Sequence, residues 1–144
     1  MRVPQNRVII DTNLWISFLL TSDLSKFDSI LANNKITLIF SQELVEEFVE
    51  VTQRNKFKKY FALDDVENLL IKMRSRALFI SVKSKVEVCR DVKDNFLLAL
   101  ALDSKATHLI TGDKDLLVLK NYGNTKIVTM NEYLTETNIA SKSK

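Results

Sequence analysis

The chain has 144 residues, of which 46% are hydrophobic and 27% charged, and its formal net charge is +3. This length and composition are typical of one globular domain that can bury a real core. A single cysteine, Cys89, and a single histidine, His108, exclude an intrachain disulfide and a zinc site built from several thiolates or histidines. The mild positive charge permits contacts with phosphate groups without demonstrating them.

The first predicted element is a strand that runs into a carboxylate. Apolar residues from Val8 to Ile10 lead to Asp11, and an amphipathic stretch over residues 14–20 follows after Thr12 and Asn13. This pattern predicts a buried strand followed at once by a helix. In an open α/β sheet, the carboxyl end of such a strand is the usual place for a ligand or a metal.

Helical and strand-like segments alternate along the rest of the chain, which favours an α/β fold with a parallel sheet. Ser41 stands where the N-cap of a helix belongs, and Asp64 resembles the cap of another. The apolar pattern predicts helices over residues 24–33, 42–54, 64–76, 94–105 and 131–137, and strands over residues 36–40, 78–82, 107–111 and 126–129. We predict a loop over residues 84–93 and a turn over residues 112–115.

Two glycines and one proline leave no flexible linker in the sequence. We therefore expect one domain over residues 1–137, followed by a polar, mobile tail over residues 138–144. No stretch approaches 18 apolar residues, and the N-terminal region has no long apolar segment. We expect a cytoplasmic protein that makes no membrane contact.

Four acids lie at the boundaries of the predicted elements: Asp11, Glu47, Asp94 and Asp113. Because the carboxyl ends of parallel strands meet at one edge of a sheet, these acids can converge. Convergence is unfavourable for carboxylates alone, and a divalent cation removes the repulsion. Mg²⁺ and Mn²⁺ prefer such oxygen ligands and can promote hydrolysis of a phosphodiester.

Each acid also has a purely structural interpretation that the sequence leaves open. Asp11 could cap the helix after it, and Asp94 could be a helix-start acid favoured by the helix dipole. Asp113 could be a turn former. Glu47 could be a solvated helix residue. On a helical wheel, it lies only slightly closer to the apolar stripe than Glu46 does.

The ordered set of motifs resembles the PIN-domain ribonucleases, over roughly residues 7 to 134. The closest branch is that of the VapC-like toxins of bacterial toxin–antitoxin pairs. The segments that carry the resemblance are Val8 to Asn13, Leu44 to Phe48, Arg90 to Asn95, and Ile110 to Leu117.

The resemblance implies a three-layer α/β/α sandwich around a mainly parallel sheet and Mg²⁺- or Mn²⁺-dependent cleavage of RNA. Its implied partners are an RNA substrate, a cognate antitoxin protein and a second copy in a homodimer. The implied catalytic and metal-binding acids are Asp11, Glu47, Asp94 and Asp113, with Asp115 as an alternative or additional metal ligand. Asn13, Ser41 and Thr111 match supporting polar residues.

Other functions remain to be compared with this one. A phosphoacceptor receiver domain would need a second acid after Asp11, where Thr12 and Asn13 stand. A haloacid-dehalogenase-type phosphatase would need an aspartate in place of Asn13. A non-catalytic PIN-like module that binds RNA or protein is a further alternative. Basic stretches over residues 54–59 and 72–76 could bind a phosphate backbone or form a solvated face; the candidate RNA-binding residues are Arg54, Lys56, Lys58 and Lys59.

Overall fold

The centre of the structure, a computed structural model, is a six-stranded sheet with the strand order β3-β2-β1-β4-β6-β5. Residues 6–21, 28–30, 32–54, 59 and 63–137 are described. The strands are β1 (Asn6–Ile10), β2 (Ile36–Phe40), β3 (Ala77–Phe79), β4 (His108–Ile110), β5 (Asn121–Tyr122) and β6 (Thr125–Val128). Among them, β5 pairs antiparallel with β6, and the four other pairs are parallel.

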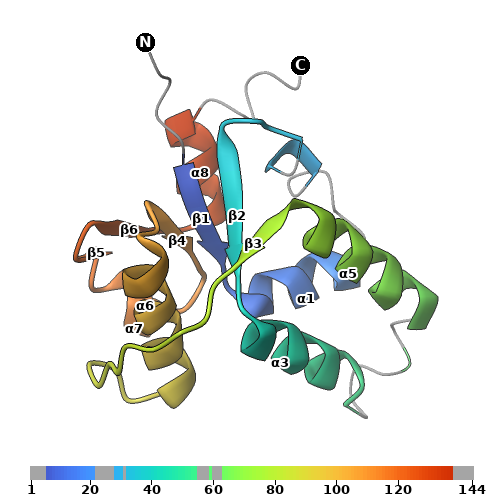
Figure 1. Cartoon of the computed structure of the whole chain (residues 1–144), viewed down its shortest axis with the longest axis horizontal. Helices are drawn as coiled ribbons and strands as arrows, with labels where there is room; N and C mark the ends of the chain where they lie inside the picture. The colour runs from blue at the N-terminus through green and yellow to red at the C-terminus, as the bar shows by residue number, and fades with distance from the viewer. Residues whose placement is uncertain (1–5, 22–27, 31, 55–58, 60–62, 138–144) are drawn as a thin grey trace.

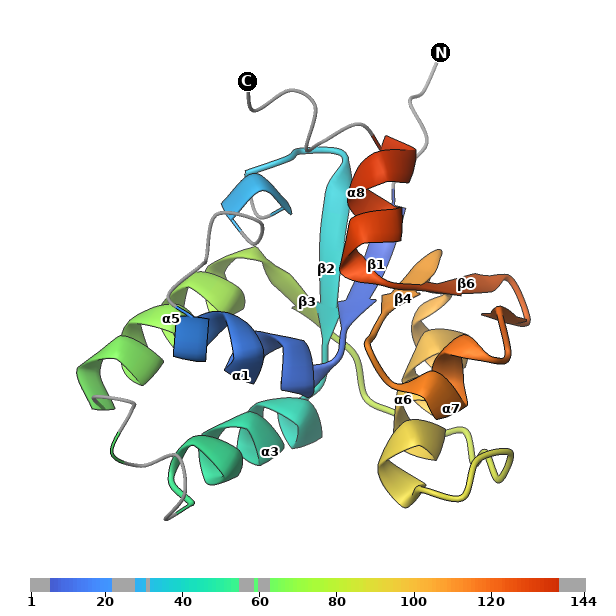
Figure 2. The same cartoon turned by 180° about the vertical axis from the view of Figure 1, so that it is seen from behind.

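Helices lie on both faces of this sheet (Figures 1 and 2). α6 lies in front of the sheet in Figure 1, and α8 lies on the opposite face, in front in Figure 2. The described helices are α1 (Thr12–Thr21), α3 (Gln42–Thr52), α5 (Leu63–Arg76), α6 (Val92–Ser104), α7 (Lys114–Leu117) and α8 (Met130–Thr137). The predicted three-layer α/β/α sandwich with a mainly parallel sheet is confirmed.

The strand order reverses at β1, which lies between β2 and β4. The chain leaves β1 toward β2 and β3, and it returns on the other side to form β4 and β6. In open α/β sheets, ligands bind outside the carboxyl ends of the strands at such a reversal. Asp11 follows β1 and Thr111 follows β4, so both residues stand at this position.

The core forms on both faces of β1, as expected for a strand inside a parallel sheet. Val8, Ile9 and Ile10 are all buried. The predicted apolar helix, α6, contributes Leu97, Leu98, Leu100 and Ala101 to the same core. Asp94, also buried, lies one turn before these residues on α6, so core packing fixes the position of its carboxylate.

Several predicted boundaries differ from the observed ones. The helix predicted from Asp94 begins at Val92, because the side chain of Asp91 accepts a hydrogen bond from the Lys93 amide and caps it. The helix predicted from Asp64 begins at Leu63, so Asp64 lies in its first turn and is not the cap. The strand predicted over residues 78–82 is the three-residue β3.

The region after β4 contains more structure than predicted. Residues 112–115 were predicted as a turn, but Asp113 caps the short helix α7 and accepts a hydrogen bond from the Asp115 amide. The strand β5 was not predicted. Of the helix predicted over residues 24–33, residues 28–30 are helical and residues 32–33 are not. Residues 24–27 and 31, and the predicted tail over residues 138–144, lie outside the described residues.

Candidate metal centre

Asp11 and Thr111 are joined at the carboxyl ends of β1 and β4. Ile10 and Ile110 are register partners, and the Asp11 amide donates a 2.9 Å hydrogen bond to the carbonyl of Ile110. The Thr111 hydroxyl donates a 2.9 Å hydrogen bond to Oδ2 of Asp11 and accepts one of 3.0 Å from the Asp113 amide. Thr111 therefore fixes the Asp11 carboxylate and the turn that carries Asp113, as a supporting residue would.

Glu47 reaches the same end of the sheet from the second turn of α3. Its Oε1 accepts a 2.7 Å hydrogen bond from the hydroxyl of the buried Thr12 and lies 3.7 Å from Nζ of Lys93. Glu46, its close competitor on the helical wheel, is exposed. Of these two glutamates, the structure directs Glu47 toward the acids.

Three aspartates form the tightest group of acids. Asp94, Asp113 and Asp115 each offer a carboxylate oxygen within 4.8 Å of the others. We call these three residues the aspartate triad. Asp94 is only 2% exposed, and its Oδ2 has no hydrogen-bond partner among the described residues. Asp11 and Glu47 lie outside this 4.8 Å group but face the same sheet end.

The triad is electrostatically strained without a cation. The pKa of Asp94 is raised to about 7, first by burial and then by the hydrogen bond and the negative charge of Asp113. Burial, followed by the charges of Asp94 and Asp115, also raises the pKa of the Cys89 thiol. A divalent cation fits this donor set, because all the donors are carboxylate oxygens and one buried oxygen lacks a partner.

The supporting residues of the prediction occupy different places. The buried Ser41 caps α3, because its hydroxyl accepts a hydrogen bond from the Leu44 amide. Asn13 is exposed, and its amide oxygen lies 3.3 Å from Nζ of Lys93. The single histidine, His108, lies away from these residues in β4 and contacts the hydroxyl of Thr107, Glu136 at 2.9 Å and the ring of Tyr133.

The structure describes two of the four predicted RNA-binding residues, Arg54 and Lys59. Arg54 forms an exposed ion pair of 2.9 Å with Glu50, four residues earlier. Lys59 is exposed. Lys56 and Lys58 lie outside the described residues.

Two residues near the acids were not predicted. Thr12 is buried against Glu47, and Lys93 lies between Asp11 and Glu47. Lys93 carried no usable signal, because the sequence pattern placed it in the loop before the helix predicted from Asp94, whereas the observed α6 begins at Val92. Thr12 carried none, because its partner is 35 residues away.

A model of the PIN domain matches residues 7–115 of the chain, a span that contains all five acids. The chain belongs to the PIN domain family. The uncharacterized protein MJ1680 of Methanocaldococcus jannaschii is 31% identical over 139 residues, which cover 94% of this chain and 84% of that protein. The family match confirms the predicted resemblance at the level of the PIN domain.

A solved structure shares the fold of this PIN domain. A chain in the crystal structure of VapBC2 from Rickettsia felis, bound to a DNA fragment from their promoter, superimposes with a TM-score of 0.56 at 16% identity. The match covers 84% of this chain and 96% of that chain. At this identity the likeness concerns the fold.

A hollow of about 430 Å³ begins beside the acids of the PIN domain and runs between α1 and α3. Asn13, Glu47 and Lys93 line the end of the hollow that belongs to the acidic centre, whereas the apolar wall includes Ile16 and Leu20. Arg54 also lines it. The hollow is therefore continuous with the acids and carries both apolar and cationic side chains.

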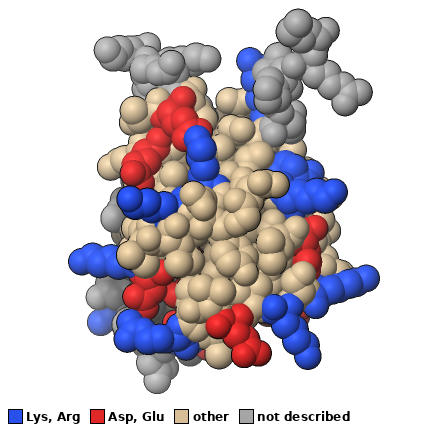
Figure 3. Space-filling view, turned by 90° about the vertical axis from the view of Figure 1, so that its left-hand side faces the viewer, with Lys and Arg blue, Asp and Glu red and all other residues tan. Residues whose placement is uncertain are grey.

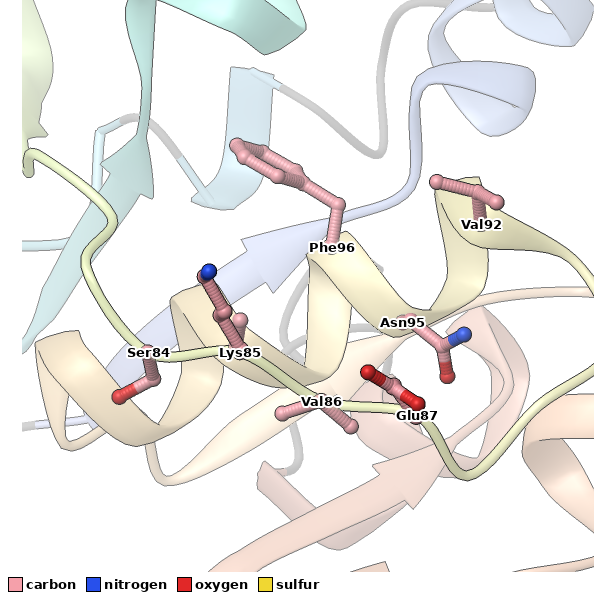
Figure 4. A pocket seen from close by; sticks show the side chains of 8 residues that line it. Ser84, Lys85, Val86, Glu87, Val92, Asn95 and Phe96 are labelled. Atoms are coloured by element: carbon pink, nitrogen blue, oxygen red, sulfur yellow. The ribbon is translucent and has the colours of Figure 1, made fainter.

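A second hollow, of about 420 Å³, lies on another face of α6 (Figure 4). Val92, Phe96 and Ala99 line it from the helix, and Val86 lines it from the preceding loop. These helix positions follow the spacing of one face, and Asp94 lies on the opposite, buried face of α6. This second hollow is separate from the acidic centre.

Charged side chains do not gather in one patch on the side of the molecule that holds β5, β6 and α7. Figure 3 shows lysines and arginines interspersed with aspartates and glutamates around a largely uncharged centre. The net charge of +3 therefore forms no continuous basic stripe on this face. Among the described helices, none is long and apolar enough to cross a membrane.

Proposed function

We propose that this PIN domain is an endoribonuclease that hydrolyses RNA phosphodiester bonds with Mg²⁺ or Mn²⁺ and serves as the toxin of a toxin–antitoxin pair. One observation carries the proposal: Asp94 is buried beside Asp113 and Asp115, and one of its oxygens has no partner. A buried carboxylate without a partner is costly to keep in a fold unless a ligand compensates for it.

The aspartate triad would hold the divalent cation. When bound, such a cation stabilises negative charge that develops on a phosphodiester and eases the ionisation of an attacking water. Thr111 keeps Asp11 and the turn of Asp113 in register through two hydrogen bonds. Thr12 similarly directs Glu47 inward. The acids are thus preorganised by buried hydroxyl groups on rigid elements.

The lining of the hollow between α1 and α3 favours a single-stranded substrate. Its apolar wall suits the face of a nucleobase, and Arg54 at its border suits a phosphate group. Side chains of this kind contact unpaired RNA more readily than a duplex, whose bases are stacked and paired. We expect cleavage in loops or unpaired segments.

The deciding experiment is cleavage of a defined panel of RNAs with Mn²⁺ and with a chelator. The wild-type PIN domain should cut at least one unpaired segment with Mn²⁺ only, and Asp94→Asn should abolish the cut. Asp65→Asn is the matched control, because Asp65 is exposed in the first turn of α5. Equal cleavage by wild type and Asp94→Asn would reject the nuclease proposal.

The toxin role needs a separate experiment in cells. Expression of the wild-type PIN domain should slow growth, Asp94→Asn should remove the effect, and co-expression of a small neighbouring gene product should relieve it. Normal growth with a protein that cleaves RNA in vitro would reject the toxin role and leave the nuclease role in place. A folded protein that binds RNA without cutting it would instead favour a non-catalytic PIN module.

A further inference from the structure

Lys93 occupies an unusual position for a lysine. It is the second residue of α6, where the partial positive charge of the helix N-terminus disfavours a cation. Its side chain is nevertheless only 25% exposed. A lysine that is largely withdrawn from water at this end of a helix requires compensating negative charge nearby.

The compensation comes from three elements of the acidic centre. Nζ of Lys93 lies 3.8 Å from Oδ1 of Asp11 and 3.7 Å from Oε1 of Glu47. It also lies 3.3 Å from Oδ1 of Asn13 in the first turn of α1. The ammonium group is therefore placed where the end of β1, α1 and α3 meet.

The positive charges of the chain leave one part of the centre uncompensated. Arg90 pairs with Asp115 at 3.1 Å, and Lys93 pairs with Asp11 and Glu47. Among the described residues, no lysine or arginine forms an ion pair with Asp94 or Asp113. The remaining negative charge thus lies between these two aspartates.

An ammonium at this position excludes a second metal ion. In centres with two metals, the ions lie about 3.5–4 Å apart and share the surrounding carboxylates. A cation bound to both Asp11 and Glu47 would need the space and the oxygen atoms that Nζ of Lys93 occupies. Like charges at such a distance repel strongly in a partly buried site.

We propose that Lys93 takes the place of a second metal ion, so that this PIN domain binds one divalent cation, between Asp94 and Asp113. The inference rests on the metal centre of the proposed function and adds its stoichiometry and a positioning role for Lys93. In this role, Lys93 holds Asp11 and Glu47 together and neutralises them without a metal.

The test counts bound Mn²⁺ per chain in the absence of RNA, by the electron paramagnetic resonance signal of free Mn²⁺ during titration. The wild type should bind one ion. Lys93→Met should bind two, because Asp11 and Glu47 become available. Lys93→Arg keeps the charge and should bind one. Lys114→Met is the matched control, because it removes an exposed lysine beside Asp113 and should also leave one ion.

The outcomes separate this inference from the proposed function. Two ions in the wild type, or one ion in a folded Lys93→Met variant, overturns the role of Lys93 and leaves a metal-dependent nuclease. No bound Mn²⁺ in the wild type overturns both. If Lys93→Met fails to fold, Lys93→Gln removes the charge but keeps a hydrogen-bonding side chain and should also bind two ions; one ion in a folded Lys93→Gln variant overturns the role of Lys93.

Discussion

The hydroxyl of Thr12 donates a 2.7 Å hydrogen bond to Oε1 of Glu47. Thr12 is 1% exposed and is the first residue of α1, directly after Asp11. The hydrogen bond therefore links the end of β1 to α3, and it limits the rotamers that the Glu47 side chain can adopt. Buried partners of this kind commonly tune the acids of a metal centre.

The first prediction concerns this hydroxyl. Thr12→Val keeps the shape of the side chain but removes the donor, so Glu47 is no longer held toward the acids. We expect RNA cleavage to fall by about 10- to 100-fold, the range typical of such supporting residues. The measurement is the cleavage rate at saturating Mn²⁺. Thr12→Ser retains the donor and should stay close to wild type; equal rates for the serine and valine variants would contradict the role of the hydroxyl.

Glu47 and Glu46 provide a matched pair for the second prediction. Glu47 contacts Thr12 and Lys93, whereas Glu46 is exposed and lies 3.4 Å from the side chain of Gln42. Glu47→Gln should lower the cleavage rate by at least about 10-fold, since it removes a charge from the centre. Glu46→Gln should leave the rate within about twofold of wild type. Similar losses in both variants would indicate a general effect of the charge of α3.

The sequence indicated most of the acids because their places are set locally. An apolar strand that ends in Asp11, and a second that leads to Thr111 and Asp113, place these residues at one sheet edge whatever the rest of the fold does. Asp94 likewise follows from the start of an apolar helix. For Asp113, capping a helix does not compete with a place among the acids, because it caps α7 and its carboxylate also belongs to the triad.

Other features depend on tertiary contacts and could not be predicted. The helical wheel hardly separated Glu47 from Glu46, and the packing of α1 against α3 made the distinction. Lys93 meets an asparagine 80 residues away, which no local pattern encodes. The sequence could not choose between Asp113 and Asp115 as a ligand; both lie in the triad with Asp94, and the ion pair of Asp115 with Arg90 distinguishes them.

Ser41 gives a third prediction, which separates helix capping from a role at the centre. Its hydroxyl accepts a 3.2 Å hydrogen bond from the Leu44 amide and thereby caps α3. Ser41→Ala should lower the free energy of unfolding by about 1 kcal/mol, the usual contribution of such a cap. Urea unfolding measures this loss. Mn²⁺ binding should be unchanged, and a weakened Mn²⁺ affinity would assign Ser41 a direct role at the acids.

The fourth prediction is a dependence of metal-free stability on pH. Burial is the main cause of the raised pKa of Asp94, and the hydrogen bond and negative charge of Asp113 add to it. The pKa rises from 3.8 in the unfolded chain to about 7 in the fold. The folded state therefore binds this proton more tightly. Its contribution to stability is fully present below the unfolded value and is lost as the pH rises through about 7.

Urea unfolding in the presence of a chelator, at about pH 5 and about pH 8, measures this contribution. The wild type should lose stability between the two conditions more than Asp94→Asn does, because the amide does not titrate. Mn²⁺ affinity should show the opposite trend and increase with pH up to about 7, since the cation binds the ionised carboxylate. Identical pH profiles for the wild type and Asp94→Asn would contradict the raised pKa.

The last prediction contrasts two aspartates of α6 that differ in how their charges are satisfied. Asp94 is buried beside other acids, and its Oδ2 has no described partner. Asp103 accepts hydrogen bonds from the Ser84 side chain and amide and from the Lys83 amide. These hydrogen bonds lower the pKa of Asp103, and the one from the Ser84 side chain has the largest effect. In chelator at neutral pH or above, Asp94→Asn should therefore raise the melting temperature, by about 2–4 °C for each kcal/mol of relieved charge. Asp103→Asn should lower it, because the amide loses charge-assisted hydrogen bonds.

Calorimetry of both variants with and without Mn²⁺ measures the effect, and Mn²⁺ should stabilise the wild type and Asp103→Asn but not Asp94→Asn. A lower metal-free melting temperature for Asp94→Asn would mean that this carboxylate stabilises the fold, and that its burial needs no cation.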